Sequence, residues 1–71
     1  MSDGAVSGVV RAFEESRGIG VIDADGRSYP FHCTQIADGT RTVRVGTTVQ
    51  FRIVPGRRGD WEAAEIEKSE A

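Results

Sequence analysis

The sequence predicts an all-β fold in which five short antiparallel strands close into a small barrel. Three observations support this: valine-rich and alternating apolar segments recur along the 71 residues, none has the spacing of an amphipathic helix, and an Asp-Gly pair separates two of them. Because five strands in so short a chain would leave bare edges in an open sheet, a closed barrel is favoured. At this length we expect one domain over residues 1–71, with an ordered core at about 5–67.

The first strand is expected from Ala5 to Phe13. This segment is rich in valine, which favours a strand, and Gly8 would weaken a helix. Its core candidates are Val6, Val10 and Phe13. A short polar turn over residues 14–16 should then lead into the second strand, which we predict from Arg17 to Asp23.

A hairpin is predicted to join the second strand to a third strand, Arg27 to Cys33. The turn residues Asp25 and Gly26 suit a two-residue hairpin loop, in which both positions need positive φ. Since side chains alternate along a strand, one set should face the core and the other should face outward. The inward set is Ile22, Tyr29 and Phe31, and the outward set is Ile19, Val21, Pro30 and His32. Pro30 lacks an N–H group and fits where its nitrogen faces no partner strand.

The second half of the chain contains a long loop and two more strands. Residues 34–46 lack a sustained period, which predicts a loop with one helical turn. Thr47 to Val54 alternates cleanly, with Val49, Phe51 and Ile53 inward. After a loop over residues 55–59, a final strand is expected from Trp61 to Glu67, with Ala64 and Ile66 in phase.

Composition and charge exclude several classes of function. A formal charge of −2 argues against a strong, non-specific polyanion binder, although four of the eleven acids lie in the last ten residues and the preceding body is close to neutral. The lone Cys33 can form no intrachain disulfide, and no Cys or His cluster suits zinc, so we expect no metal and no cofactor. No catalytic motif is present, no segment suits a membrane span or a leader, and we expect a non-enzymatic cytoplasmic protein.

Several segments together resemble the bacterial cold-shock domain, a five-stranded barrel of the OB type. The matching residues are Gly8-Val-Val-Arg-Ala-Phe13, Arg17-Gly-Ile-Gly-Val-Ile22, Ser28-Tyr-Pro-Phe-His32, the loop from Ile36 through Asp38-Gly39 to Gly46, and Val49-Gln-Phe51. The resemblance extends over about residues 5–66. It implies a surface on the first three strands where single-stranded DNA or RNA stacks its bases on exposed rings while basic side chains meet the phosphates.

Most of the rings that this resemblance implies are replaced. The family's stacking aromatics correspond to Ala12, Ile19, Val21, Pro30, Cys33 and Thr40. His32 remains as a ring, and Arg11, Arg17 and Arg58 retain positive charge at positions that contact the nucleic-acid backbone in the family. Trp61 either supplies a replacement stacking surface or packs against the barrel end, and packing is the favoured interpretation. The predicted binding residues are Arg11, Arg17, Ile19, Val21, Pro30, His32, Arg58 and Trp61.

Two functions are therefore expected from the sequence. Since stacking on an aromatic ring contributes roughly 1–3 kcal/mol per base, the missing rings should weaken binding by several kcal/mol. The first hypothesis is a weakened single-stranded RNA- and/or DNA-binding protein that acts as a passive chaperone or as a regulator of transcription or translation. The alternative is a repurposed barrel whose exposed aliphatic patch binds a protein partner or forms a homodimer.

Overall fold

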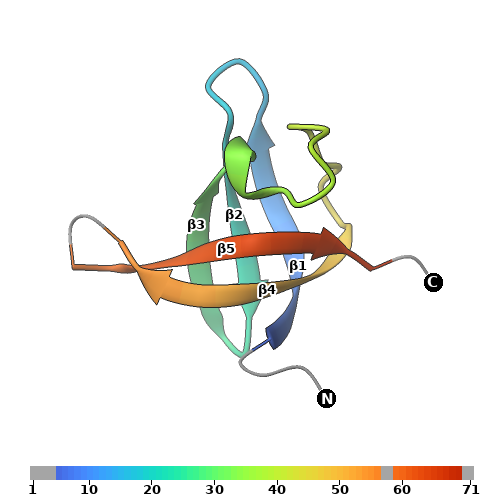
Figure 1. The fold of residues 1–71 in the computed structure, drawn as a ribbon. Helices are drawn as coiled ribbons and strands as arrows, with labels where there is room; N and C mark the ends of the chain where they lie inside the picture. Colours follow the sequence, from blue (N-terminus) through green and yellow to red (C-terminus); the bar gives the residue numbers. More distant parts are fainter. Residues whose placement is uncertain (1–4, 57–58, 70–71) are drawn as a thin grey trace.

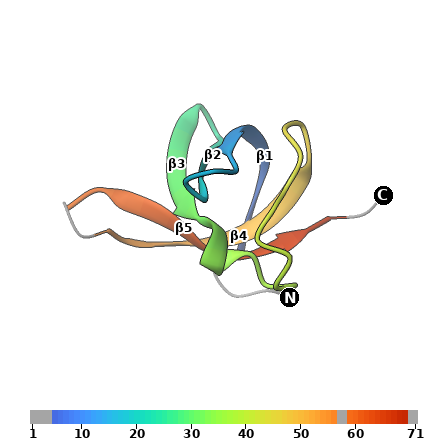
Figure 2. The ribbon, with the colours of Figure 1, turned by 90° about the horizontal axis from the view of Figure 1, so that it is seen from above.

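The computed structural model describes residues 5–56 and 59–69, which fold into one five-stranded antiparallel sheet. Its elements are β1 (Ala5–Glu14), β2 (Ile19–Ala24), β3 (Arg27–His32), the 3₁₀ turn η1 (Cys33–Gln35), β4 (Thr48–Pro55) and β5 (Trp61–Lys68). The strand order is β3-β2-β1-β4-β5. In Figure 1, β4 and β5 cross the first three strands, and Figure 2 shows the sheet curling so that β3 approaches β5. The predicted all-β barrel is thus confirmed.

The barrel interior is filled by side chains from every strand and from the long loop. Phe51, Ile22, Ile66, Val10 and Val49 are its largest fully buried side chains. Tyr29 and Phe31 are also buried, as the alternation predicted, and the ring of Tyr29 lies against that of Phe51 with centroids 5.7 Å apart. No charged or polar residue is buried among the described residues, so apolar burial is the main stabilising term here.

The hairpin between β2 and β3 forms around the predicted turn. Asp25 and Gly26 have φ values of 53° and 75°, the positive values that this turn requires. The resulting register pairs Gly20 with Phe31. A Cβ atom on Gly20 would lie 2.5 Å from the Phe31 ring and 2.7 Å from the Ala12 carbonyl oxygen, so only glycine lets the ring cross β2 at this point.

A β-bulge in β1 changes which side chains face outward. Val10 pairs with Ile22 and Ala12 pairs with Val21, so Arg11 is the extra residue. The bulge therefore leaves Arg11 and Ala12 both exposed, whereas strict alternation would have turned Ala12 inward. The following residue, Phe13, becomes partly buried and stacks on Phe31 with ring centroids 5.9 Å apart.

A second bulge, in β5, corrects the predicted phase of that strand. Ala63 and Ile66 are the buried residues, while Ala64 is only half-buried, so the prediction that Ala64 and Ile66 share the inward phase is wrong. Between the pairs Gln50–Glu67 and Arg52–Ala64, β5 contains one residue more than β4. The extra residue lies at Glu65, with φ of 51°, and it shifts the inward phase from the odd position Ala63 to the even position Ile66.

Local hydrogen bonds account for the shifted ends of β2 and β3. The amides of Arg17 and Gly18 both donate to the Glu14 carbonyl, which forms a turn where the sequence predicted strand, so β2 begins at Ile19. The third strand ends at His32 because Cys33 enters η1, the helical turn expected in the long loop. Cys33 remains fixed to the barrel through its amide, which donates to the Gly18 carbonyl at 2.7 Å.

The long loop is tied to the end of β5 around Asp38. The Thr40 amide and hydroxyl donate to Asp38 Oδ1 at 3.0 and 2.8 Å, and Lys68 Nζ lies 3.3 Å from Asp38 Oδ2. These contacts, the backbone hydrogen bond from Thr40 first, lower the pKa of Asp38 below its usual value. Thr40 therefore serves to fix the loop at the position where the resemblance implies a ring.

Candidate nucleic-acid interface

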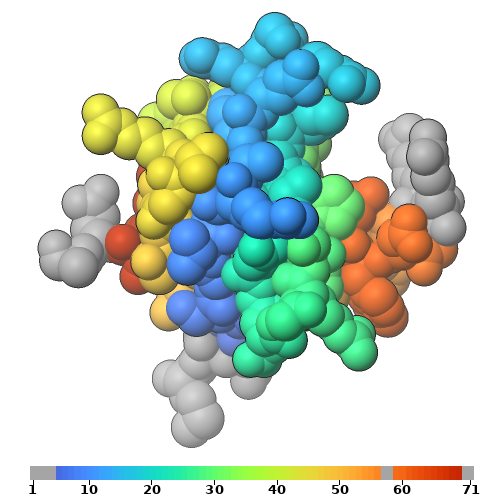
Figure 3. Space-filling view, turned by 180° about the vertical axis from the view of Figure 1, so that it is seen from behind, coloured from blue at the N-terminus to red at the C-terminus, as the bar shows by residue number. Residues whose placement is uncertain are grey.

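The outer face of β1, β2 and β3, which is turned toward the reader in Figure 3, carries a mainly aliphatic hollow. We call its outward residues, Ala12, Ile19, Val21, Pro30 and His32, the platform. They line one hollow of about 440 Å³ together with Glu14, Gly20, Phe31 and Glu62. The prediction that Ile19, Val21, Pro30 and His32 face outward together is thus confirmed. Ile19 is 38% exposed, and Val21 is half-buried between its neighbours.

His32 has one ring nitrogen committed to the protein and the other directed elsewhere. His32 is the N-cap residue of η1, because its Nδ1 accepts a hydrogen bond from the Thr34 amide at 3.3 Å. The same nitrogen lies 3.0 Å from the Thr34 hydroxyl. Since Nδ1 accepts, the neutral ring carries its proton on Nε2. The ring is therefore held in one orientation, and no residue that the structure describes forms a hydrogen bond with Nε2.

Arg11 belongs to a hydrogen-bonded network that crosses all three strands. Its Nε lies 3.1 Å from Asp23 Oδ1, and its terminal nitrogen donates to the Ser28 hydroxyl at 3.1 Å. Ser28 in turn donates to Asp23 Oδ1 at 2.7 Å. The guanidinium of Arg11 is still well exposed, but a phosphate would have to compete with the Asp23 carboxylate for it.

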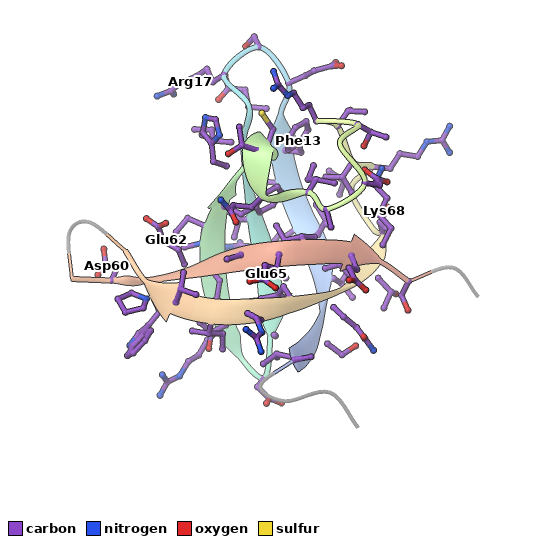
Figure 4. All side chains as sticks on the ribbon, in the orientation of Figure 1. Phe13, Arg17, Asp60, Glu62, Glu65 and Lys68 are labelled. Atoms are coloured by element: carbon purple, nitrogen blue, oxygen red, sulfur yellow. The ribbon has the colours of Figure 1, made fainter. Side chains whose placement is uncertain are left out.

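Arg17 lies in the turn before β2 and is also paired with an acid. Its guanidinium is 3.7 Å from Glu14 Oε1, and both side chains are largely exposed. Figure 4 shows Arg17 at the tip of this turn, beyond Phe13. An exposed pair of this kind contributes only about 0–1 kcal/mol, so Glu14 can release Arg17 at little cost.

Two carboxylates at the hollow were missed by the sequence analysis. Glu14 is the last residue of β1, just before the turn, and Glu62 reaches the hollow from β5, where Figure 4 shows it above the strand. Glu62 comes close only because the barrel brings β5 next to β3. Neither the resemblance to a known family nor strand parity pointed to these acids, since strict alternation would turn Glu14 inward with Val10 and only the β1 bulge turns it outward. Both lower the electrostatic potential that a phosphate would meet here.

Trp61 lies outside the hollow that its neighbour Glu62 lines. Its side chain is 53% exposed, more than a ring packed on a barrel end would leave, so the packing interpretation is not supported. Successive side chains of a strand take opposite faces, which separates Trp61 from Glu62 and from the platform. Arg58, the remaining predicted binding residue, lies outside the described residues.

Other kinds of site find no support in the part of the chain that the structure describes. Residues 5–56 and 59–69 contain no group of His, Cys, Asp and Glu side chains able to hold a metal ion. Within the same ranges, no helix is long and apolar enough to cross a membrane. The half-buried Cys33 packs beside Gly18, whose Cβ position lies 2.7 Å from its sulfur.

Comparison with known proteins supports the same interpretation of the fold. Residues 6–69 match the family model described as the 'Cold-shock' DNA-binding domain, which covers nearly the whole chain. No curated protein matches the sequence. The matched family is one of nucleic-acid-binding rather than catalytic domains. The chain therefore belongs to the cold-shock DNA-binding domain family.

Proposed function

We propose that this protein binds single-stranded nucleic acid, RNA and/or DNA, on the platform, in the cytoplasm and as a single domain. The observation that supports this most directly is the convergence of Ile19, Val21, Pro30 and His32 on one exposed hollow, in a chain that belongs to a nucleic-acid-binding family. Base planes would lie on the aliphatic side chains and on the His32 ring. Arg11, Arg17 and Arg58 would meet the phosphates, since guanidinium pairs with phosphate in a bidentate manner.

The proposed binding is weaker than is typical of the family. Aliphatic side chains present less flat area to a base than aromatic rings do, and each lost stack removes roughly 1–3 kcal/mol. In addition, Asp23 and Glu14 already pair with two of the proposed arginines. Weak and reversible contact suits a passive role, in which the protein keeps strands unpaired as a chaperone or modulates transcription or translation.

A second candidate function is a protein-interaction or homodimerisation module. It is favoured by the aliphatic lining of the hollow and by the two carboxylates, Glu14 and Glu62, at its edge. These acids repel phosphate but would attract a basic side chain from a protein partner. Trp61 would be an additional exposed contact in that case.

Salt dependence separates the two candidates. Labelled oligothymidylate and oligouridylate are titrated with the protein at about 50 and about 200 mM salt, with sedimentation of the same samples. Nucleic-acid binding predicts an affinity that falls steeply with salt and weakens in a His32→Ala variant. A protein that dimerises, with an association insensitive to salt, supports the second function. The absence of oligonucleotide binding at low salt refutes the first.

A further inference from the structure

A second surface borders the platform on the far side of β1, at the turn over residues 44–47. The Thr47 amide donates to the Arg44 carbonyl at 3.1 Å, and Gly46 has φ of 96°, which closes a tight turn with Val45 at its tip. The Gly46 amide donates to the Val10 carbonyl at 2.8 Å, and the Val10 amide donates to the Thr47 carbonyl at 2.9 Å. The turn is therefore fixed directly beside the β1 bulge.

Figure 3 shows this yellow segment next to blue β1, on the side of β1 opposite to β2 and β3. A nucleic-acid strand that crosses β3, β2 and β1 in that order would leave the platform over this turn. Two apolar side chains are exposed along that path. Val45 is 62% exposed and Val9, on β1, is 44% exposed. Both exceed the exposure of Ile19 on the platform itself.

Arg44 differs from the predicted binding arginines in its electrostatic surroundings. Within residues 5–56 and 59–69, its guanidinium has no ion pair and no hydrogen bond, whereas Arg11 and Arg17 are each paired with a carboxylate. It lines a shallow hollow of about 410 Å³ with Thr42, Val43, Thr47, Lys68 and Ser69, a set without a carboxylate. A phosphate at Arg44 would displace no acid of the described residues, so the gain from counterion release would not be offset by breaking an ion pair among them.

We propose that Arg44 and Val45 extend the nucleic-acid path beyond β1 by one nucleotide, with the guanidinium on a phosphate and the valine against the adjoining base or sugar. This inference rests on the proposed function. It locates the strongest phosphate contact among the described residues outside the platform, on a turn held to β1 by two backbone hydrogen bonds.

The test compares Arg44→Gln with Arg52→Gln, which removes the same charge from exposed β4 on the other side of the barrel. Labelled oligothymidylates of increasing length are titrated over a range of salt. Loss of one phosphate contact should make the slope of log affinity against log salt concentration shallower by about 0.7 in Arg44→Gln than in the wild type. At about 50 mM salt, this corresponds to an affinity about 8-fold lower than that of the wild type. This loss should appear only with oligonucleotides long enough to pass β1, and Arg52→Gln should bind like the wild type.

A gain-of-function variant provides a second readout. Val45→Trp adds a ring at the exposed tip of the turn and should raise affinity for the long oligonucleotides at least about fivefold. If the wild type and His32→Ala differ in affinity but Arg44→Gln and Val45→Trp match the wild type, the extension is refuted while the proposed function stands. Equal losses in Arg44→Gln and Arg52→Gln would also refute it, since they would indicate a net-charge effect. If the wild type binds no oligonucleotide, both proposals fail.

Discussion

Restoring a ring to the platform is the most direct way to test its role. Ile19 is 38% exposed and lies opposite His32 in the register of β2 and β3. Directly opposite side chains have Cβ atoms about 4.5–5.5 Å apart, so Ile19→Phe would create two adjacent rings on one face. Because Ile19 is a partly exposed edge residue of the hollow, the substitution should change stability by no more than about 0.5 kcal/mol.

The expected gain follows from the energy of base stacking. A ring contributes roughly 1–3 kcal/mol per base relative to alanine, and since isoleucine already supplies some contact area, we take the lower end, about 1 kcal/mol. This corresponds to an affinity for oligothymidylate about fivefold higher, measured by fluorescence anisotropy at low salt. The matched control is Gln50→Phe, which adds the same ring to the exposed side of β4. A folded Ile19→Phe variant that binds no better than wild type, or a Gln50→Phe variant that gains equally, would refute the platform as the stacking surface.

Three further predictions concern charge, packing and pH. Asp23→Asn should free Arg11 and raise the oligonucleotide affinity at low salt, with a steeper salt slope in the same titration; an unchanged slope would exclude Arg11 as a phosphate contact. Gly20→Ala should lower the free energy of unfolding by about 1–3 kcal/mol in urea denaturation, because its methyl group would overlap the Phe31 ring; wild-type stability would contradict the packing described. Because the pKa of Asp38 is lowered on folding, its ionised form stabilises the fold at pH values above its ordinary pKa of 3.8, and this contribution is lost as the pH falls through the lower pKa of the folded state. Asp38→Asn should therefore make the melting temperature fall less steeply with pH on the acid side. A pH profile identical to that of the wild type would refute this coupling.

Local sequence patterns were sufficient to predict side-chain orientation wherever a strand follows strict alternation. The inward positions of Tyr29, Phe31 and Phe51 and the outward positions of Ile19 and Pro30 were all predictable from parity. The hairpin turn was equally predictable, since its two residues carry their own conformational preference for positive φ. Resemblance to a known family then identified the fold, which the family match confirms.

Parity failed at the two bulges, because a bulge is a mismatch between two strands and leaves no signal in either one alone. Ala64 was assigned to the wrong phase for this reason, and the exposure of Ala12 depends on the extra residue Arg11. A single inserted residue reverses every later side chain of the strand. The pairing partner decides where that insertion falls.

The amino-acid sequence by itself determined the strands, the hairpin turn and the aliphatic character of the outer face, because these depend on side-chain type and on period-two geometry within short segments. Only the tertiary structure decided the electrostatics of that face. Closure of the barrel brings Glu62 to the hollow, Asp23 lies across the sheet from Arg11, and Arg44 lies beside β1 without an ion pair to any described residue. Coulombic interactions depend on distance in space, and residues far apart in the sequence acquire such distances only when the strands pair.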